Sequence, residues 1–200
     1  MNPMLPSKLR LSAALGIAAS LALAALMCAA SARSEPIARN ADPAGPVVER
    51  GRYLVTVAGC NDCHTPWKMG LAGPEPDMTR MLSGHPEQMD LPPAPKLPEG
   101  PWIASVSATN TAWSGPWGVS YTANLTPDET GLGKWTLRDF VATIRTGRHL
   151  GRGREVLPPM PIRMYRNFTD DDLAAIYAYL RSIPRIRNRV PEPLPPAASP

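Results

Sequence analysis

Residues 60–64 read Cys-Asn-Asp-Cys-His, and this short motif limits what the chain can fold into more than any other feature. Cys-x-x-Cys-His is the attachment sequence of a c-type haem. Cysteines three positions apart on a helical turn lie on one face, so each can form a thioether with a haem vinyl group. His64 follows directly and can reach the iron as the proximal axial ligand. The motif therefore predicts one covalently bound haem c, held by Cys60, Cys63 and His64.

Two other chemistries use a Cys-x-x-Cys pair, and both fit this chain less well. A thioredoxin-like dithiol would lie beside a βαβ pattern, and none is visible near Cys60. A structural zinc ion needs four ligands, usually from a second paired cluster. The other candidates beyond residue 32, His85 and His149, stand isolated in the sequence. Haem remains the interpretation that accounts for the whole motif.

The N-terminal residues carry the features of a secretory signal peptide. Lys8 and Arg10 precede an Ala/Leu-rich stretch, and Ala30-Ser31-Ala32 forms a small-x-small cleavage signal. We therefore expect residues 1–32 to be removed on export to the periplasm and residues 33–46 to form a flexible leader. The alternative is a retained membrane anchor, because about twenty weakly apolar residues can just span a bilayer. Lipidation at Cys28 fits less well, since the residue before it is a bulky methionine.

Removal of residues 1–32 would leave a nearly neutral chain with two cysteines. The remainder holds 19 Lys and Arg against 17 Asp and Glu, so no basic excess points to nucleic acid. Cys60 and Cys63 are the cysteines that remain, and the haem motif uses both. The 25 prolines of the full chain indicate many ordered loops or linkers.

Helix signals mark three segments beyond the leader. Residues 47–58 read as a first helix, with Glu49 in its opening turn and Gly59 at its end. A second helix is predicted after the N-cap Thr136, and Gly147 stops it. The last helix is predicted from Thr169 to the residues before Pro184, with three aspartates favouring its N-terminal dipole.

The stretch between the haem motif and the second helix, residues 65–134, gives the least regular pattern. Its prolines between positions 86 and 101 exclude long helices. Aromatic residues in the same stretch indicate an ordered cover; they are Trp102, Trp113, Trp117 and Tyr121. We leave open whether these aromatics cover the haem or contact a partner, and packing within the loop itself is an equally good interpretation.

Met160 is the predicted sixth ligand of the iron. It lies in Leu157-Pro158-Pro159-Met160-Pro161, where prolines fix an extended backbone that presents one side chain stiffly. Methionine sulfur favours ferrous iron and raises the reduction potential. The main rivals are Met164 and His149, of which the second is more simply a solvated surface histidine. A methionine that merely fills a core gap is the structural alternative.

Together these motifs resemble a class I c-type cytochrome. The resemblance rests on Gly51-Arg52-Tyr53-Leu54, on the haem and Met160 motifs, and on the run from Leu173 to Pro184. Three further runs indicate a more specific group within this family. They are Ser83-Gly84-His85-Pro86, Asn124-Leu125-Thr126-Pro127-Asp128 and Thr130-Gly131-Leu132-Gly133. They resemble single haem modules from the cytochrome subunits of bacterial membrane-bound alcohol and gluconate dehydrogenases.

The resemblance implies a fold and a function. The fold would be all-α, a class I cytochrome c domain over residues 47–188 with a long irregular insertion, followed by a proline-rich tail at 189–200. Cys60 and Cys63 would bind haem, His64 and Met160 would ligate iron, and no catalysis is expected. We expect a periplasmic monohaem carrier that takes electrons from a dehydrogenase and passes them to an oxidase or another cytochrome. A peroxidase or gas-binding enzyme with a displaceable sixth ligand, and a permanently docked dehydrogenase subunit, remain alternatives.

Overall fold

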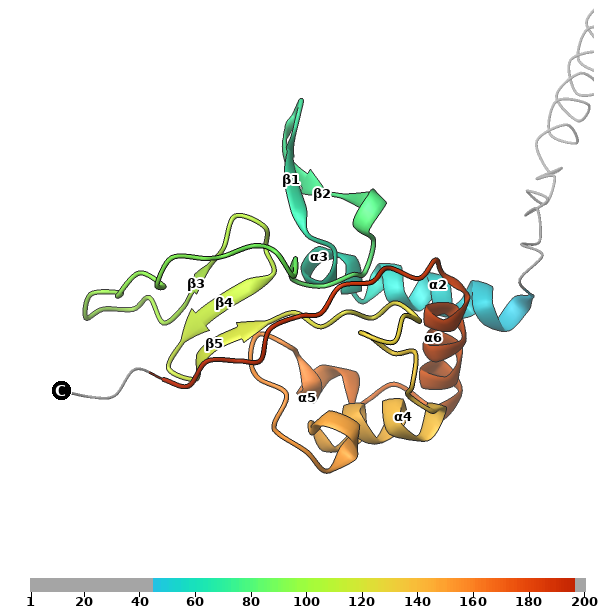
Figure 1. Ribbon diagram of the computed structural model, residues 1–200. Helices are drawn as coiled ribbons and strands as arrows, with labels where there is room; N and C mark the ends of the chain where they lie inside the picture. Colours follow the sequence, from blue (N-terminus) through green and yellow to red (C-terminus); the bar gives the residue numbers. More distant parts are fainter. Residues whose placement is uncertain (1–44, 197–200) are drawn as a thin grey trace, which may run out of the picture. The chain divides into compact units, whose positions relative to one another are not determined.

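The computed structural model describes residues 45–196, which contain five α-helices and two small antiparallel sheets (Figure 1). The expected signal peptide, most of the expected leader and residues 197–200 lie outside the described residues. Helix accounts for 33% and strand for 14% of the structure. The all-α fold class is therefore wrong, and the strands that overturn it all lie in the 65–134 insertion.

The insertion folds into strands that are too short for sequence patterns to reveal. Strands β1 (Trp67–Gly70) and β2 (Gly73–Pro76) form a hairpin. Strands β3 (Ser105–Val106), β4 (Ala112–Gly115) and β5 (Gly118–Tyr121) form a sheet in the order β3-β4-β5. Strands of two to four residues show no usable alternation, and their pairing depends on partners across a turn. The prolines between positions 86 and 101 lie in the connection from β2 to β3, where residues 86–104 form neither helix nor strand.

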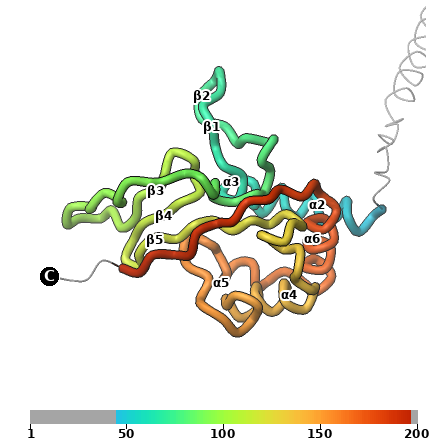
Figure 2. The backbone as a smooth tube through the Cα atoms, in the orientation of Figure 1, coloured from blue at the N-terminus to red at the C-terminus, as the bar shows by residue number. Residues whose placement is uncertain are grey.

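The β1–β2 hairpin stands away from the helices in both backbone views (Figures 1 and 2). Leu71 at its turn is fully exposed, and Met69 is largely exposed. The base of the hairpin is joined to the loop between β3 and β4, because the Trp67 backbone N–H donates to the Thr109 carbonyl at 2.9 Å.

The first and last described helices, α2 (Pro46–Val57) and α6 (Asp170–Ser182), cross at a glycine. A Cβ atom at Gly51 would overlap the Ala175 carbonyl oxygen and lie 2.8 Å from Tyr179 Cβ. The two backbones therefore approach so closely that only glycine fits at this point. The expected helix over residues 47–58 is confirmed to within one residue at each end.

Helix α4 (Leu137–Thr146) and helix α6 begin at the caps that the sequence predicts. Thr136 Oγ1 accepts from the Asp139 backbone N–H, and the Asp139 carboxylate accepts in return from the Thr136 N–H. Gly147 ends α4 in the left-handed conformation, with φ of 69°. Thr169 caps α6 by accepting from the Asp172 N–H at 3.0 Å. A short helix, α5 (Ile162–Tyr165), lies between them.

One hydrophobic core joins the helices to the insertion. Its buried side chains come mainly from α2, α4, α5 and α6, and Leu82 and Leu132 join them from loops. Two single turns of 3-10 helix, η1 (Met78–Arg80) and η2 (His149–Gly151), complete the elements of residues 45–196.

The chain beyond α6 is extended and is held against the domain. We call residues 186–194 the C-terminal strap. Leu194 pairs with Val119 of β5 through two backbone hydrogen bonds of 2.9 Å, and Asn188 is almost completely buried. In both backbone views the strap runs beside β5 and the loop that follows it (Figures 1 and 2). The expected proline-rich tail thus begins as an ordered part of the fold.

Candidate haem site

The haem motif itself forms a short helix, α3 (Cys60–His64), which the insertion holds in place. Gly59 precedes it in the left-handed conformation, with φ of 70°, and so separates α3 from α2. The Asp62 carbonyl accepts from Trp67 Nε1 at 3.0 Å and from Asn110 Nδ2 at 2.6 Å. These bonds satisfy a carbonyl that the helix end leaves free. The position of the cysteines and histidine therefore depends on residues up to fifty positions away.

His64 is buried, and its hydrogen bond determines which ring nitrogen can bind a metal. Its Nδ1 lies 2.7 Å from the Ala123 carbonyl oxygen. A carbonyl can only accept, so Nδ1 carries the proton and Nε2 keeps its electron pair. Burial also lowers the pKa of His64, although the Ala123 carbonyl opposes this shift. A neutral imidazole with a free Nε2 is the form that ligates iron.

The two cysteines have the properties of protonated thiols. Burial raises the pKa of Cys60 to about 11, and burial likewise raises the pKa of Cys63. Reactive dithiol pairs show the opposite shift, because the thiolate is the attacking species. Within residues 45–196 no group of three or more His, Cys, Asp and Glu side chains could hold a metal ion. The raised pKa values of the two thiols are therefore the reverse of the shift expected for a redox dithiol.

A cavity of about 470 Å³ opens beside α3, in the size range of small-molecule and cofactor pockets. Cys60, Cys63, His64 and Met160 all line it. The rest of its wall is largely apolar and comes from α4, α6 and the intervening loops; it includes Leu125, Leu132, Trp135, Phe140, Ile144, Val156, Tyr165, Phe168, Leu173, Ile176 and Leu180. Such a wall suits a large, flat, apolar cofactor, and two thiols and two potential iron ligands face the same space.

Among the methionines of residues 45–196, Met160 alone lines this cavity. Met164, the nearest rival in sequence, is 62% exposed and does not reach it. His149 does contribute to the wall, and its ring meets Trp135 edge-on at 5.1 Å between centroids. His149 is therefore an exposed histidine, as expected from its sequence position, and its ring also contacts an aromatic side chain at the cavity.

The Met160 loop is fixed by polar contacts at both ends. Ser120 Oγ in β5 donates to the Pro158 carbonyl at 2.5 Å. The Met160 carbonyl accepts from the Ile162 N–H at 2.9 Å at the start of α5. Tyr165 in α5 in turn donates its hydroxyl to the Ala58 carbonyl at 2.6 Å, just before the haem motif. These bonds connect the two opposite sides of the site.

Comparison with known proteins places these features in a family. The chain is 29% identical over 136 residues to the fructose dehydrogenase cytochrome subunit of Gluconobacter japonicus. It is also 29% identical over 143 residues to the cytochrome c subunit of the quinone-dependent alcohol dehydrogenase of Gluconobacter oxydans. The chain is a relative of bacterial dehydrogenase cytochrome subunits. One of the subunits of the nicotinate dehydrogenase of Pseudomonas putida is 30% identical to it over 147 residues.

The similarity covers most of this chain but only a part of each relative. The matches span 68–72% of the chain and 9–22% of the relatives' own length. No protein-family model matches the chain. Within residues 45–196 no helix is long and apolar enough to cross a membrane. The similarity therefore corresponds to a part of these longer proteins.

Several residues of the site carry no signal that sequence inspection could interpret. Ala123 acts through its carbonyl and Ser120 through a hydroxyl, and neither residue type marks a haem module. Tyr165 and the strap residues Arg189 and Glu192 also line the cavity. The run Asn124-Leu125-Thr126-Pro127-Asp128 is the one available clue, because it begins directly after Ala123.

Proposed function

We propose that this chain is a periplasmic monohaem cytochrome c that carries single electrons from a dehydrogenase to an oxidase or another cytochrome. Cys60 and Cys63 would attach the haem, and His64 and Met160 would be its axial ligands. One arrangement supports this assignment most: these four residues line the same apolar cavity, and the Ala123 carbonyl leaves Nε2 of His64 available.

The residues of the chain would hold the cofactor and tune it. Haem, when bound, supplies a one-electron iron couple. The Ala123 carbonyl orients His64 and keeps its ring in the required tautomer. Ser120 holds the loop that presents Met160, whose sulfur would favour ferrous iron. The apolar side chains of α4 and α6 would exclude water, and with His64 and Met160 both bound to the iron no position would remain for a substrate.

The relatives support a dehydrogenase as the electron donor, since three of them are cytochrome subunits of fructose, alcohol and gluconate dehydrogenases. They also support a second candidate, a cytochrome permanently docked in such a complex. Exposed apolar side chains on the insertion, such as Leu71, Trp102 and Ile103, favour this candidate too. Copurification with a larger subunit from the native membrane or periplasm would distinguish it from a free carrier.

The decisive experiment is the substitution Met160→Ala in the purified, haem-loaded protein. Loss of the sulfur ligand should remove the sulfur-to-iron charge-transfer band of the ferric form, lower the midpoint potential and open the iron to cyanide or carbon monoxide. Met164→Ala is the matched control, because Met164 is exposed and away from the cavity. It should leave all three properties unchanged.

A packing role for Met160 leads to a different result. Truncation would then cost about 2 to 5 kcal/mol of stability and leave the haem spectrum as in the wild type. That outcome would contradict the axial assignment and favour His149, which also lines the cavity.

A further inference from the structure

The wall of the haem cavity is polar at one end, where the C-terminal strap meets the loop before the Met160 segment. Two arginines, Arg154 and Arg189, line the cavity there, and both are exposed residues. Glu192 and Asn124 are their polar neighbours on the wall. The opposite walls, formed by α4 and α6, are apolar. A ligand bound in this cavity would therefore meet positive charge on one edge.

The two arginines differ in what they already bind. Arg154 Nε donates to Glu192 Oε2 at 3.2 Å, so this guanidinium is neutralised by a carboxylate of the strap. The Arg189 guanidinium has no hydrogen-bond or ion-pair partner among residues 45–196. Its backbone N–H is nevertheless fixed, because it donates to Glu87 Oε2 at 3.0 Å. Arg189 thus combines a fixed backbone with an unpaired positive side chain at the cavity.

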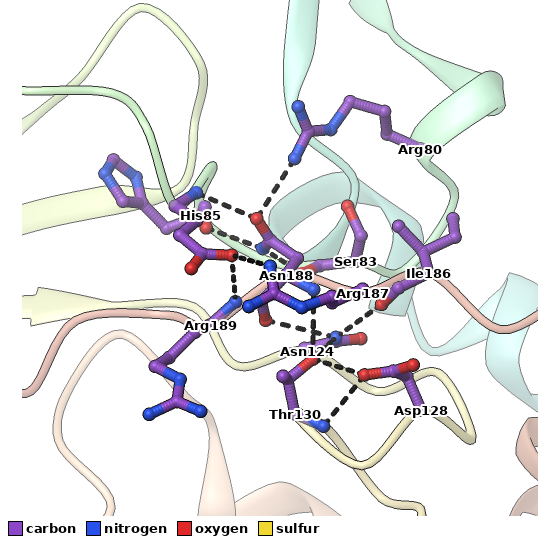
Figure 3. A network of polar contacts seen from close by, with 11 residues as sticks. Arg80, Ser83, His85, Asn124, Asp128, Thr130, Ile186, Arg187, Asn188 and Arg189 are labelled. Atoms are coloured by element: carbon purple, nitrogen blue, oxygen red, sulfur yellow. Dashed lines mark hydrogen bonds and ion pairs between the residues drawn. The ribbon is translucent and has the colours of Figure 1, made fainter.

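The neighbouring residue explains why the strap is held so firmly. The Asn188 side chain donates to the Ser83 and His85 carbonyls, at 2.7 and 2.8 Å. Its Oδ1 accepts from Arg80 and from the Glu87 N–H. Figure 3 shows this network, with the Arg189 side chain extending away from it. The network therefore positions the Arg189 backbone without using its guanidinium.

We propose that Arg189 binds a haem propionate and so neutralises it at the edge of the cavity. This inference rests on the proposed function, because it requires haem in the cavity. Haem carries two carboxylates on one edge of an otherwise apolar ring, and a carboxylate taken out of water is costly unless it is paired. A guanidinium offers a carboxylate two parallel charge-assisted hydrogen bonds. Arg189 provides an unpaired group of this kind at the polar end of the cavity.

The pairing has a measurable effect on the iron. An uncompensated propionate charge would favour the ferric form, and the Arg189 charge cancels it. Arg189→Gln should therefore lower the midpoint potential of the haem-loaded protein while the His/Met spectrum stays as in the wild type. Arg189→Lys keeps the charge and should restore most of the potential.

Two variants serve as controls in the same redox titration. Arg187→Gln makes the same charge change two residues earlier on the strap, but Arg187 pairs with Glu87 and does not line the cavity. Its potential should stay near that of the wild type. An unchanged potential in Arg189→Gln, or an equal shift in Arg187→Gln, would overturn the proposal. A shift in Arg154→Gln with none in Arg189→Gln would transfer the role to Arg154 and also overturn it.

The outcome separates this inference from the proposed function. A wild-type protein without covalent haem would contradict the proposed function before any potential is compared. A wild-type haem spectrum with identical potentials in all variants would contradict the role of Arg189 alone.

Discussion

At the scale of single residues, Asn188 connects three segments that are far apart in the sequence. Its amide group fits its surroundings on both sides, since two carbonyls face its N–H groups and two donors face its oxygen. Its backbone N–H donates to Thr130 Oγ1, and its carbonyl accepts from Asn124 Nδ2. The side chain is 1% exposed, so water cannot replace these partners.

Replacing Asn188 with aspartate tests this network with almost no change of shape. Asn188→Asp should lower the free energy of unfolding by at least about 2 kcal/mol, because the Ser83 and His85 carbonyls lose their donor and face a carboxylate oxygen. Equilibrium denaturation of the haem-loaded protein measures the change. Gln88→Glu makes the same amide-to-carboxylate change at an exposed position and should change stability by less than about 0.5 kcal/mol. Equal effects of the two substitutions would contradict a structural role for the network.

At the scale of elements, the crossing of α2 and α6 joins the beginning and the end of the described chain. Gly51 allows the close approach, and Arg50 reinforces it across the crossing. Arg50 donates from Nε and Nη2 to Asp172 Oδ1, at 3.1 and 2.9 Å. The two helices therefore combine a steric requirement with one ion pair near the N-terminus of α6.

The steric requirement predicts that Gly51→Ala destabilises the protein even though alanine is the better helix former. The higher helix propensity of alanine would stabilise α2 by about 1 kcal/mol. Its methyl group, however, would overlap the Ala175 carbonyl oxygen. We expect a net loss of about 1 to 3 kcal/mol in chemical denaturation. Val57→Ala, at a 58% exposed position of the same helix, should be neutral within about 0.5 kcal/mol. A stabilising effect of Gly51→Ala would show that the helices can separate without cost.

The ion pair predicts a pH dependence at the same crossing. The hydrogen bond from Arg50 is the main cause that lowers the pKa of Asp172 below its ordinary value. A depressed carboxyl pKa gives stability that is present above the ordinary pKa, near 4, and is lost as the pH falls through the folded-state value. Arg50→Ala should therefore cost up to about 1 kcal/mol at pH 7, because the pair is partly exposed, and progressively less below pH 4.

Denaturation curves of wild type and variant from pH 7 to pH 3 measure this difference. Arg163→Ala, which removes an exposed arginine without a carboxylate partner among residues 45–196, should show no such trend. A difference between wild type and Arg50→Ala that stays constant over this pH range would contradict the linkage.

At the scale of the whole molecule, the haem motif and the N-terminal residues make one joint prediction about the exported protein. If Ala32 ends the signal, intact-mass analysis of the periplasmic protein should find a chain that starts at Arg33 and carries the mass of one haem. The double variant Cys60→Ala and Cys63→Ala should lack the covalent haem mass and be less stable, because a bound ligand stabilises the folded state. A membrane-bound product that retains Lys8 and Arg10 would contradict cleavage.

Local signals in the sequence predicted much of the helical frame. The caps at Thr136 and Thr169 and the stop at Gly147 lie where the structure has them. The four candidate ligands also come from short motifs, and they line one cavity in the structure. Helix caps, apolar periodicity and the haem motif all act within a few neighbouring residues, so they can be read without knowledge of the fold.

The tertiary structure alone decided the rest. Four features depend on residues that lie roughly sixty to a hundred positions apart or that pair across short turns. They are the strands of the insertion, the contact of the Ala123 carbonyl with His64, the Asn188 network and the strap at the cavity. An extended segment such as the strap has no internal hydrogen bonds, so its place is set only by the partners it meets in the folded chain. This is why the sequence predicted helices α2, α4 and α6, whereas helix α5 and the polar end of the cavity, with Arg189, became visible only when the chain was folded.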